Sequence, residues 1–184
     1  MRPSDRPAER GGAKLKFLIV EGAKLKFLIV EVEGDPAPEP RPRFVLKTGL
    51  VYVPENAHRW KHAIRVAVRV ALVAEGLRVV PEPGVAFAMG FLFRFQRPQS
   101  HYRTGRFSHL VSDRAPRSHT QKPDLDNLIK AATDALGEFD GKASIVWADD
   151  SQVDRYIGTP RKRWCEEGEV PGLTLVLSRV DCPG

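Results

Sequence analysis

The stretch VAFAMGFLFRF occupies residues 85–95 and holds the longest uncharged apolar run of the chain, nine residues from Val85 to Phe93. A short apolar run that is rich in aromatic side chains is typical of a buried β-strand. The run is too short to cross a bilayer, and the charged residues 1–12 lack the apolar segment of a secretory signal. We therefore expect a buried strand in a protein without a membrane segment.

Hydrophobic patterns on either side of this strand predict two helices and several further strands. Apolar residues recur at helical spacing over 56–74, and a second helix is expected over 125–136. The expected strands cover residues 24–30, 44–46, 50–53, 144–147, 153–157 and 173–180, with a hairpin turn at 48–49. This order predicts an α+β fold in which two main helices pack on a small mixed or antiparallel sheet.

The decapeptide GAKLKFLIVE occurs twice in tandem, at 12–21 and 22–31. Two copies are too few for a solenoid, and the second copy runs directly into the following segment. A chain of 184 residues is long enough for one domain with its own core. We expect residues 1–23 to be a disordered or extra N-terminal segment with a duplicated strand, and residues 24–180 to form a single domain.

The two cysteines, Cys165 and Cys182, are too few for a disulfide framework. The sequence also has no Cys-x-x-Cys motif or Cys/His cluster of the kind that binds zinc. This cysteine usage favours a reducing compartment, so we expect a cytoplasmic protein.

Charge is distributed unevenly behind the formal net charge of +6. Residues 41–122 carry fifteen basic and four acidic groups, whereas residues 123–184 carry seven basic and twelve acidic groups. The basic part includes residues 96–122, which show no periodicity and are predicted to form a basic, mobile loop. A basic segment of this size indicates a polyanion partner, and acidic residues beside such a partner favour an intervening metal ion.

The acidic residues are concentrated in KPDLDNLIK at 122–130 and WADDSQV at 147–153. If the helix begins near Asp126, then Asp124 and Asp126 project to the same side, and Lys130 lies one helical turn further along. An antiparallel strand after the helix returns the chain to the same level, and alternation directs either Asp149 or Asp150 toward the helix. Three carboxylates then converge, as a site for Mg²⁺ or Mn²⁺ requires.

Each of these features also has an ordinary structural interpretation. An aspartate at a helix start is usually a cap, and Asp-Asp-Ser is a common turn sequence. A basic segment is equally consistent with a non-catalytic DNA-binding protein. His119 is a candidate general base, although a histidine in a basic loop is more often solvated.

Four sequence elements together resemble the RusA family of Holliday-junction resolvases, particularly its phage-type members. These elements are KPDLDNLIK at 122–130, DAL at 134–136, WADDSQV at 147–153 and the proline- and arginine-rich GDPAPEPRPR at 34–43. The resemblance extends from about residue 24 to 180. Two features depart from the family pattern: the N-terminal repeat is extra, and residues 137–145 lengthen the turn after the helix.

The resemblance implies a RusA-like fold and a Mg²⁺-dependent endodeoxyribonuclease of DNA recombination and repair, with Mn²⁺ as an acceptable substitute. It implies a homodimer that nicks two strands of a four-way junction symmetrically, leaving 5′-phosphate and 3′-hydroxyl ends. By motif position, Asp124, Asp126 and Asp150 are the expected metal-binding catalytic acids. Lys130 is then the catalytic lysine, which either neutralises developing charge or helps to deprotonate water. Asp149 matches the first acid of the second motif and is a further candidate metal ligand.

Basic residues within and around these motifs are the expected phosphate contacts. They are Arg41, Arg43, Lys61, Arg65, Arg69, Arg103, Arg106, Arg114, Arg117 and Lys122. The stripe of Val66, Val70 and Val73 on the first helix, or the N-terminal strand, is the expected dimer surface. A metal nuclease acting on other branched DNA remains an alternative interpretation of the same residues.

Overall fold

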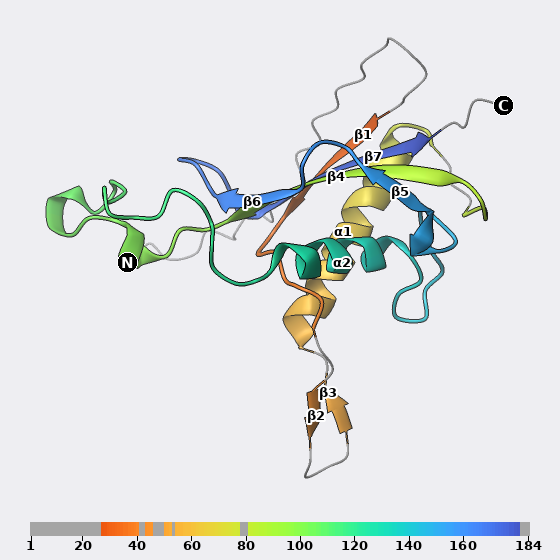
Figure 1. Cartoon of the computed structure of the whole chain (residues 1–184), viewed down its shortest axis with the longest axis horizontal. Coiled ribbons are helices and arrows are strands. Elements are labelled where there is room, and N and C mark those ends of the chain that lie inside the picture. Colours follow the sequence, from red (N-terminus) through yellow and green to blue (C-terminus); the bar gives the residue numbers. More distant parts are fainter. Residues whose placement is uncertain (1–26, 41–42, 46–49, 53, 78–80, 181–184) are drawn as a thin grey trace, which may run out of the picture.

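The computed structural model describes residues 27–40, 54–77 and 81–180, together with the backbone of 43–45 and 50–52. Strand β4 (Ala86–Phe95) lies at the centre of a five-stranded sheet (Figure 1). Strand β7 (Gly172–Val180) pairs with it antiparallel, and β1 (Phe27–Glu33) pairs antiparallel with β7. Strands β5 (Val153–Tyr156) and β6 (Arg161–Trp164) both pair parallel with β4. The predicted mixed sheet is confirmed.

Helices α1 (Glu55–Ala74) and α2 (Leu125–Leu136) belong to the same hydrophobic core as one face of the sheet. The sheet contributes alternate residues to this core, as the period of two requires. They include Val30 and Val32 of β1, Phe91 and Phe93 of β4, and Leu173 and Leu175 of β7. Both expected helices and the α+β class are therefore confirmed.

Two segments project from this body in Figure 1. Strands β2 (Arg43–Val45) and β3 (Leu50–Tyr52) form the predicted hairpin below α1. Residues 96–122, which we call the arm, extend from the end of β4 and return to the start of α2. The arm contains the short 3₁₀ turns η1 (Gln99–His101) and η2 (Gly105–Phe107).

Two sequence predictions need correction or restriction, and one strand was not predicted. Residues 144–147 are not a strand, because the chain after α2 runs through bends to the 3₁₀ turn η3 (Asp150–Gln152) before β5 begins. Strand β6 was not predicted, since its residues, RKRW, are mostly charged. The first copy of the repeat and residues 24–26 lie outside the described residues, whereas the rest of the first strand is confirmed and continues to Glu33. No helix in the described ranges is long and apolar enough to span a membrane.

Arg65 of α1 is a structural residue and not the phosphate contact that the sequence predicted. Its side chain is only 3% exposed. The guanidinium donates hydrogen bonds to the carbonyls of Ala135 at 2.7 Å, Gly137 at 2.6 Å and Ala143 at 2.6 Å. These carbonyls belong to the end of α2 and the segment that follows it, so Arg65 joins α1 to the chain that leads toward Asp149.

We predict that Arg65→Met destabilises the protein by about 3 kcal/mol or more, because three carbonyls lose a charged, buried donor. Arg69→Met is the matched control, since Arg69 is exposed one helical turn further along α1. Urea unfolding monitored by circular dichroism measures both changes. Equal stability of the two variants would contradict the bracing role of Arg65.

Candidate active site

Asp124 occupies the N-cap position of α2 but does not cap it. Its backbone is extended, and its carboxylate accepts no hydrogen bond from the helix N-terminus. Asp126 follows in the first turn, and both side chains are exposed. The ordinary capping interpretation of Asp124 is therefore wrong, and two carboxylates project from the start of α2 into solvent.

Strand β6 holds the turn that delivers Asp124. The ammonium of Lys162 donates hydrogen bonds to the carbonyls of Gln121 and Pro123, each at 2.6 Å. The indole of Trp164 donates to the carbonyl of Ser118 at 3.2 Å. Lys162 and Trp164 are two residues apart on one strand and so share a face. The path of the chain into α2 is consequently fixed by the parallel pairing of β6 with β4.

The two aspartates of the second motif have different roles in the structure. The Asp149 carboxylate accepts a hydrogen bond from the amide of Ser151 at 2.9 Å and forms a capping box with Gln152. The hydrogen bonds from Ser151 lower the pKa of the Asp149 carboxyl. Asp150 begins η3, is exposed, and accepts no such bond. Asp149 therefore shapes the turn, and Asp150 presents an exposed carboxylate.

Gln152 ties this turn to the sheet. Its amide nitrogen donates to the carbonyls of Glu82 and Val85, each at 2.7 Å, just before β4 begins. Its amide oxygen accepts from the backbone of Asp149 at 2.9 Å. The position of Asp150 is thus set by hydrogen bonds to the start of β4, and not by the strand that the sequence predicted at 144–147.

Lys130 lies on α2 one turn after Asp126, within a network of carboxylates. Its ammonium is 3.3 Å from both oxygens of Asp134. The hydrogen bond and charge of Asp134, with smaller effects from Glu39 and Asp150, raise the pKa of Lys130. Lys130 is therefore a cation at neutral pH.

Lys61 of α1 belongs to the same network of charges, and its side chain is not exposed to solvent. It is buried, forms an ion pair with Glu39, and lies 3.6 Å from an oxygen of Asp134. Asp134 is thereby shared between Lys61 and Lys130. The predicted phosphate contact at Lys61 is corrected, because this ammonium is committed to two carboxylates inside the protein.

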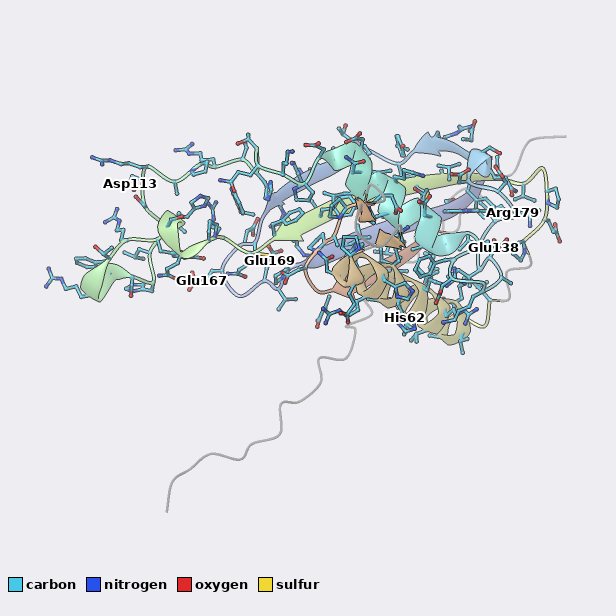
Figure 2. The ribbon with its side chains drawn as sticks, turned by 90° about the horizontal axis from the view of Figure 1, so that it is seen from below. His62, Asp113, Glu138, Glu167, Glu169 and Arg179 are labelled. Atoms are coloured by element: carbon cyan, nitrogen blue, oxygen red, sulfur yellow. The ribbon has the colours of Figure 1, made fainter. Side chains whose placement is uncertain are left out.

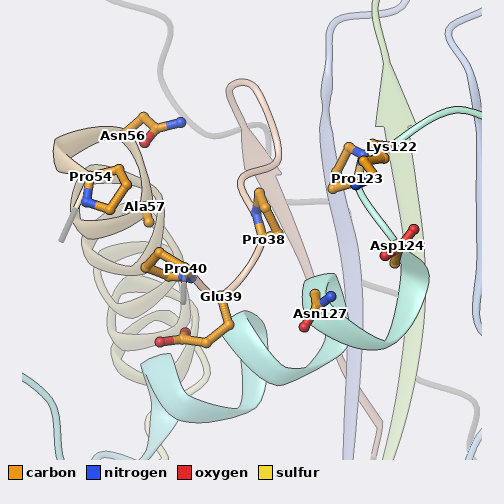
Figure 3. Close-up of a pocket in the computed structure, with 10 residues that line it drawn as sticks. All are labelled: Pro38, Glu39, Pro40, Pro54, Asn56, Ala57, Lys122, Pro123, Asp124 and Asn127. Carbon is orange, nitrogen blue, oxygen red and sulfur yellow. The ribbon is translucent and has the colours of Figure 1, made fainter. Parts of the chain in front are cut away.

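A groove of about 920 Å³ opens beside Asp124 (Figure 3). One wall is the proline segment around Glu39, and another is the start of α1 at Asn56. The third wall is the turn from Lys122 to Asn127, and the amide of Glu39 donates to the carbonyl of Asn127 at 2.9 Å. The groove therefore brings the proline-rich segment and the two helix N-termini to one place.

The predicted convergence of carboxylates is not preformed. Among the described residues, no three His, Cys, Asp or Glu side chains lie close enough together to hold a metal ion. The chemistry of the donor set nevertheless fits Mg²⁺, because Asp124, Asp126 and Asp150 are exposed oxygen donors.

The remaining predicted DNA contacts are distributed over the surface and the arm. Arg69, Arg103, Arg106, Arg114, Arg117 and Lys122 are exposed. Arg41 lies outside the described residues, and the side chain of Arg43 does too. The exposed set occupies the arm and the turn before Asp124, with Arg69 apart from it on α1.

His119 is neither solvated nor placed as a general base. Its side chain is 6% exposed, with ring centroids 4.3 Å from Phe95 and 4.2 Å from Trp164. Burial, with a smaller contribution from Lys162, lowers the pKa of His119. His101 also packs against Trp164, with a centroid distance of 5.0 Å. These histidines are part of an aromatic cluster at the root of the arm.

Sequence reasoning missed Lys162, Glu39 and Gln152 as supporting residues. Gln152 lies within the WADDSQV motif, so the motif itself was a signal for it. Glu39 lies within the GDPAPEPRPR segment, but its role, like that of Lys162, depends on a partner far away in the sequence, which local pattern does not indicate.

Comparison with known families places most of the described fold in one group. A family model described as endodeoxyribonuclease RusA matches residues 33–173. That range includes both helices, the arm, and strands β2 to β6. No curated protein matches the chain.

We predict that Glu169 stabilises β6 in a pH-dependent way. Arg163, on the face opposite Lys162, donates to both Glu169 oxygens at 2.5 and 2.7 Å, which lowers the pKa of Glu169 from 4.5 to about 2. A lowered pKa means that this stabilisation is complete above about pH 4.5 and is lost as the pH falls toward 2. Glu169→Gln should therefore be less stable than wild type at pH 7, and the difference should shrink below pH 4.5.

Urea unfolding at pH 7, 4 and 2.5 tests this dependence. Glu167→Gln is the control, because Glu167 is an exposed residue on the same turn and should show no such pH effect. A stability difference between wild type and Glu169→Gln that stays constant across this range would contradict the prediction.

Proposed function

Because the chain belongs to the RusA family of endodeoxyribonucleases, we propose that it resolves four-way DNA junctions by Mg²⁺-dependent phosphodiester hydrolysis as a homodimer. The observation that carries the proposal is the start of α2. There Asp124 lies at the N-cap position without capping, Asp126 follows it in the first turn, and Lys130 lies one helical turn further along. The Asp124 carboxylate does not bind the free amides at the start of α2, as an aspartate at this position usually does. This is consistent with a carboxylate that binds a ligand instead.

Asp124, Asp126 and Asp150 are the residues that would hold the metal. Bound Mg²⁺ supplies Lewis-acid chemistry, which makes water a stronger acid and offsets negative charge on phosphoryl oxygens. Asp149 is not needed as a ligand, since its carboxylate already caps η3. We therefore assign Asp149 to positioning, and assign to Asp150 the role of a ligand.

Lys130 acts as a fixed positive charge. Its raised pKa opposes a role as a base at neutral pH, so of the two roles expected from the sequence we retain charge neutralisation. A cation beside the scissile phosphate stabilises the charge that develops on the phosphoryl oxygens. Asp134, itself held by Lys61, restricts the ammonium to this side of α2.

The basic surface supplies affinity for the DNA backbone. Lys122 lies two residues before Asp124, and Arg114 and Arg117 precede it on the arm. Phosphate neutralisation by such residues draws a duplex toward the carboxylates without selecting a sequence. Mn²⁺ is expected to replace Mg²⁺, because both ions bind carboxylate oxygens.

We predict that Asp150→Asn lowers junction cleavage by about 100-fold or more, because it removes a carboxylate that would hold the metal ion. Asp149→Asn is the matched control on the adjacent residue, and it should retain much more activity, since its amide oxygen still accepts from Ser151. Asp126→Asn should also lose cleavage, while junction binding in EDTA is kept or tightened. Cleavage of a mobile four-way junction with Mg²⁺, Mn²⁺ or EDTA measures these effects.

Two results would contradict the assignment. Equal losses for Asp149→Asn and Asp150→Asn would remove the distinction between cap and ligand. Wild-type cleavage that persists in EDTA would show that the reaction needs no divalent metal ion.

We predict that the working unit is a dimer with one site per chain. A four-way junction has approximate two-fold symmetry, which an isologous dimer matches. The side chains of Val66, Val70 and Val73 are exposed on α1 and form a candidate contact. Sedimentation should give twice the mass of the 20.5 kDa chain, and Val70→Glu should lower it toward the monomer mass.

Mixing wild type with excess Asp126→Asn tests whether the two sites work together. Heterodimers should release singly nicked junctions, because one of their two sites is inactive. A monomer that makes both nicks would overturn the dimer model.

A further inference from the structure

The tip of the arm exposes an apolar cluster that the proposed cleavage chemistry does not use. Phe107, Leu110 and Val111 are 42%, 41% and 42% exposed. They lie in residues 102–111, which we call the finger. A β-bridge between Tyr102 and Val111 joins its two ends. Figure 2 shows Asp113, next to this cluster in sequence, at the far end of the arm, away from the helices. Apolar side chains at the end of a projecting segment do not serve the core.

The root of the arm is firmly packed, so the tip has a defined direction. Trp164 of β6 packs against His119 and His101, and Arg97 lies over the same indole at 5.6 Å. Arg97 also donates to the carbonyl of Pro116 at 3.1 Å. This hydrogen bond joins the outgoing and returning segments of the arm. These contacts thus fix the base of the arm, from which the tip projects.

Positive charge surrounds the apolar cluster. The guanidinium of Arg106 lies 4.6 Å from the centroid of the Phe107 ring. Arg103 is on the same finger, where it pairs with Asp113 at 2.8 Å, and Arg114 follows that aspartate. The partner of this surface must therefore combine negative charge with flat apolar faces. DNA with unstacked bases has both properties, since phosphates meet the arginines and bases stack on the aromatic ring.

We propose that the tip of the arm contacts unstacked bases at the branch point of DNA and thereby selects branched over linear DNA. This inference rests on the proposed junction-resolving function and adds a specificity element to it. A linear duplex offers its phosphates to the arginines but keeps its bases stacked, so it leaves Phe107 and Leu110 without a partner.

The arm is connected to the active site by a short path. Its returning strand passes Ser118, held by Trp164, and Gln121, held by Lys162, before it reaches Asp124. The same β6 residues that fix the base of the arm also fix the turn before the carboxylates. When the tip binds a branch point, the distance from that branch point to Asp124 is consequently fixed. This distance restricts which DNA phosphate lies at the active site.

Binding in EDTA tests the inference without cleavage. The probes are a four-way junction with 2-aminopurine at the branch point and a linear duplex of the same sequence. Phe107→Ser with Leu110→Ser should weaken junction binding roughly 5- to 100-fold, leave duplex binding unchanged and abolish the 2-aminopurine fluorescence change. Phe107→Trp should restore both signals in the Leu110→Ser background. Leu77→Ser is the matched control, because Leu77 is 42% exposed at the end of α1 and should alter neither signal.

The possible outcomes separate this inference from the proposed function. If wild type prefers the junction and the double variant binds it equally well with the same fluorescence change, the tip is not the selecting element. If the double variant becomes monomeric in sedimentation, the tip belongs to the dimer contact and the inference is wrong. If wild type itself shows no preference for the junction over the duplex, junction resolution fails, and the inference fails with it.

Discussion

The parallel pairing of β6 with the second half of β4 is the constraint on which the site depends. It places Lys162 and Trp164 on one face, where they hold the backbone of Gln121, Pro123 and Ser118. The chain would otherwise enter α2 from a long excursion with no fixed direction. With this pairing, the arm has a packed root and Asp124 has a defined position. A strand of four residues thus organises both the arm and the start of α2.

Basic residues divide between the interior and the surface, and the division explains how an electropositive protein builds an acidic site. Arg65 and Lys61 are buried, where they satisfy carbonyls and carboxylates between the two helices. Lys130 stays at the surface as a cation, held by Asp134. The carboxylates of Asp124, Asp126 and Asp150 are exposed, and no ion pair holds them among the residues that the structure describes, so their charge remains available for a cation.

Local pattern was enough to predict both helices and most strands of the main sheet, and it marked Asp124, Asp126, Lys130 and Asp150 as candidate site residues. The spacing of apolar residues placed α2 at 125–136, where the structure has it. Pattern failed where long-range contacts decide. Strand β6 is highly charged and exists because it pairs with β4, and Arg65 was predicted to contact phosphate although it is buried against the end of α2. The route to Asp150 was also wrong, because a turn held by Gln152 replaces the expected strand. The distinction between Asp149 and Asp150 required coordinates, since capping depends on backbone geometry.

The β-bridge between Tyr102 and Val111 gives the arm a modular character. The amide of Ser112 donates to the carbonyl of His101 at 2.8 Å, so the two sides of the finger meet just below the tip. Residues beyond that junction form a loop whose ends are already joined, and the cost of closing a loop grows only slowly with its length. Insertions or deletions there leave β4, β6 and α2 in place. The length of the finger is therefore a quantity that evolution or an engineer can adjust independently of the catalytic carboxylates.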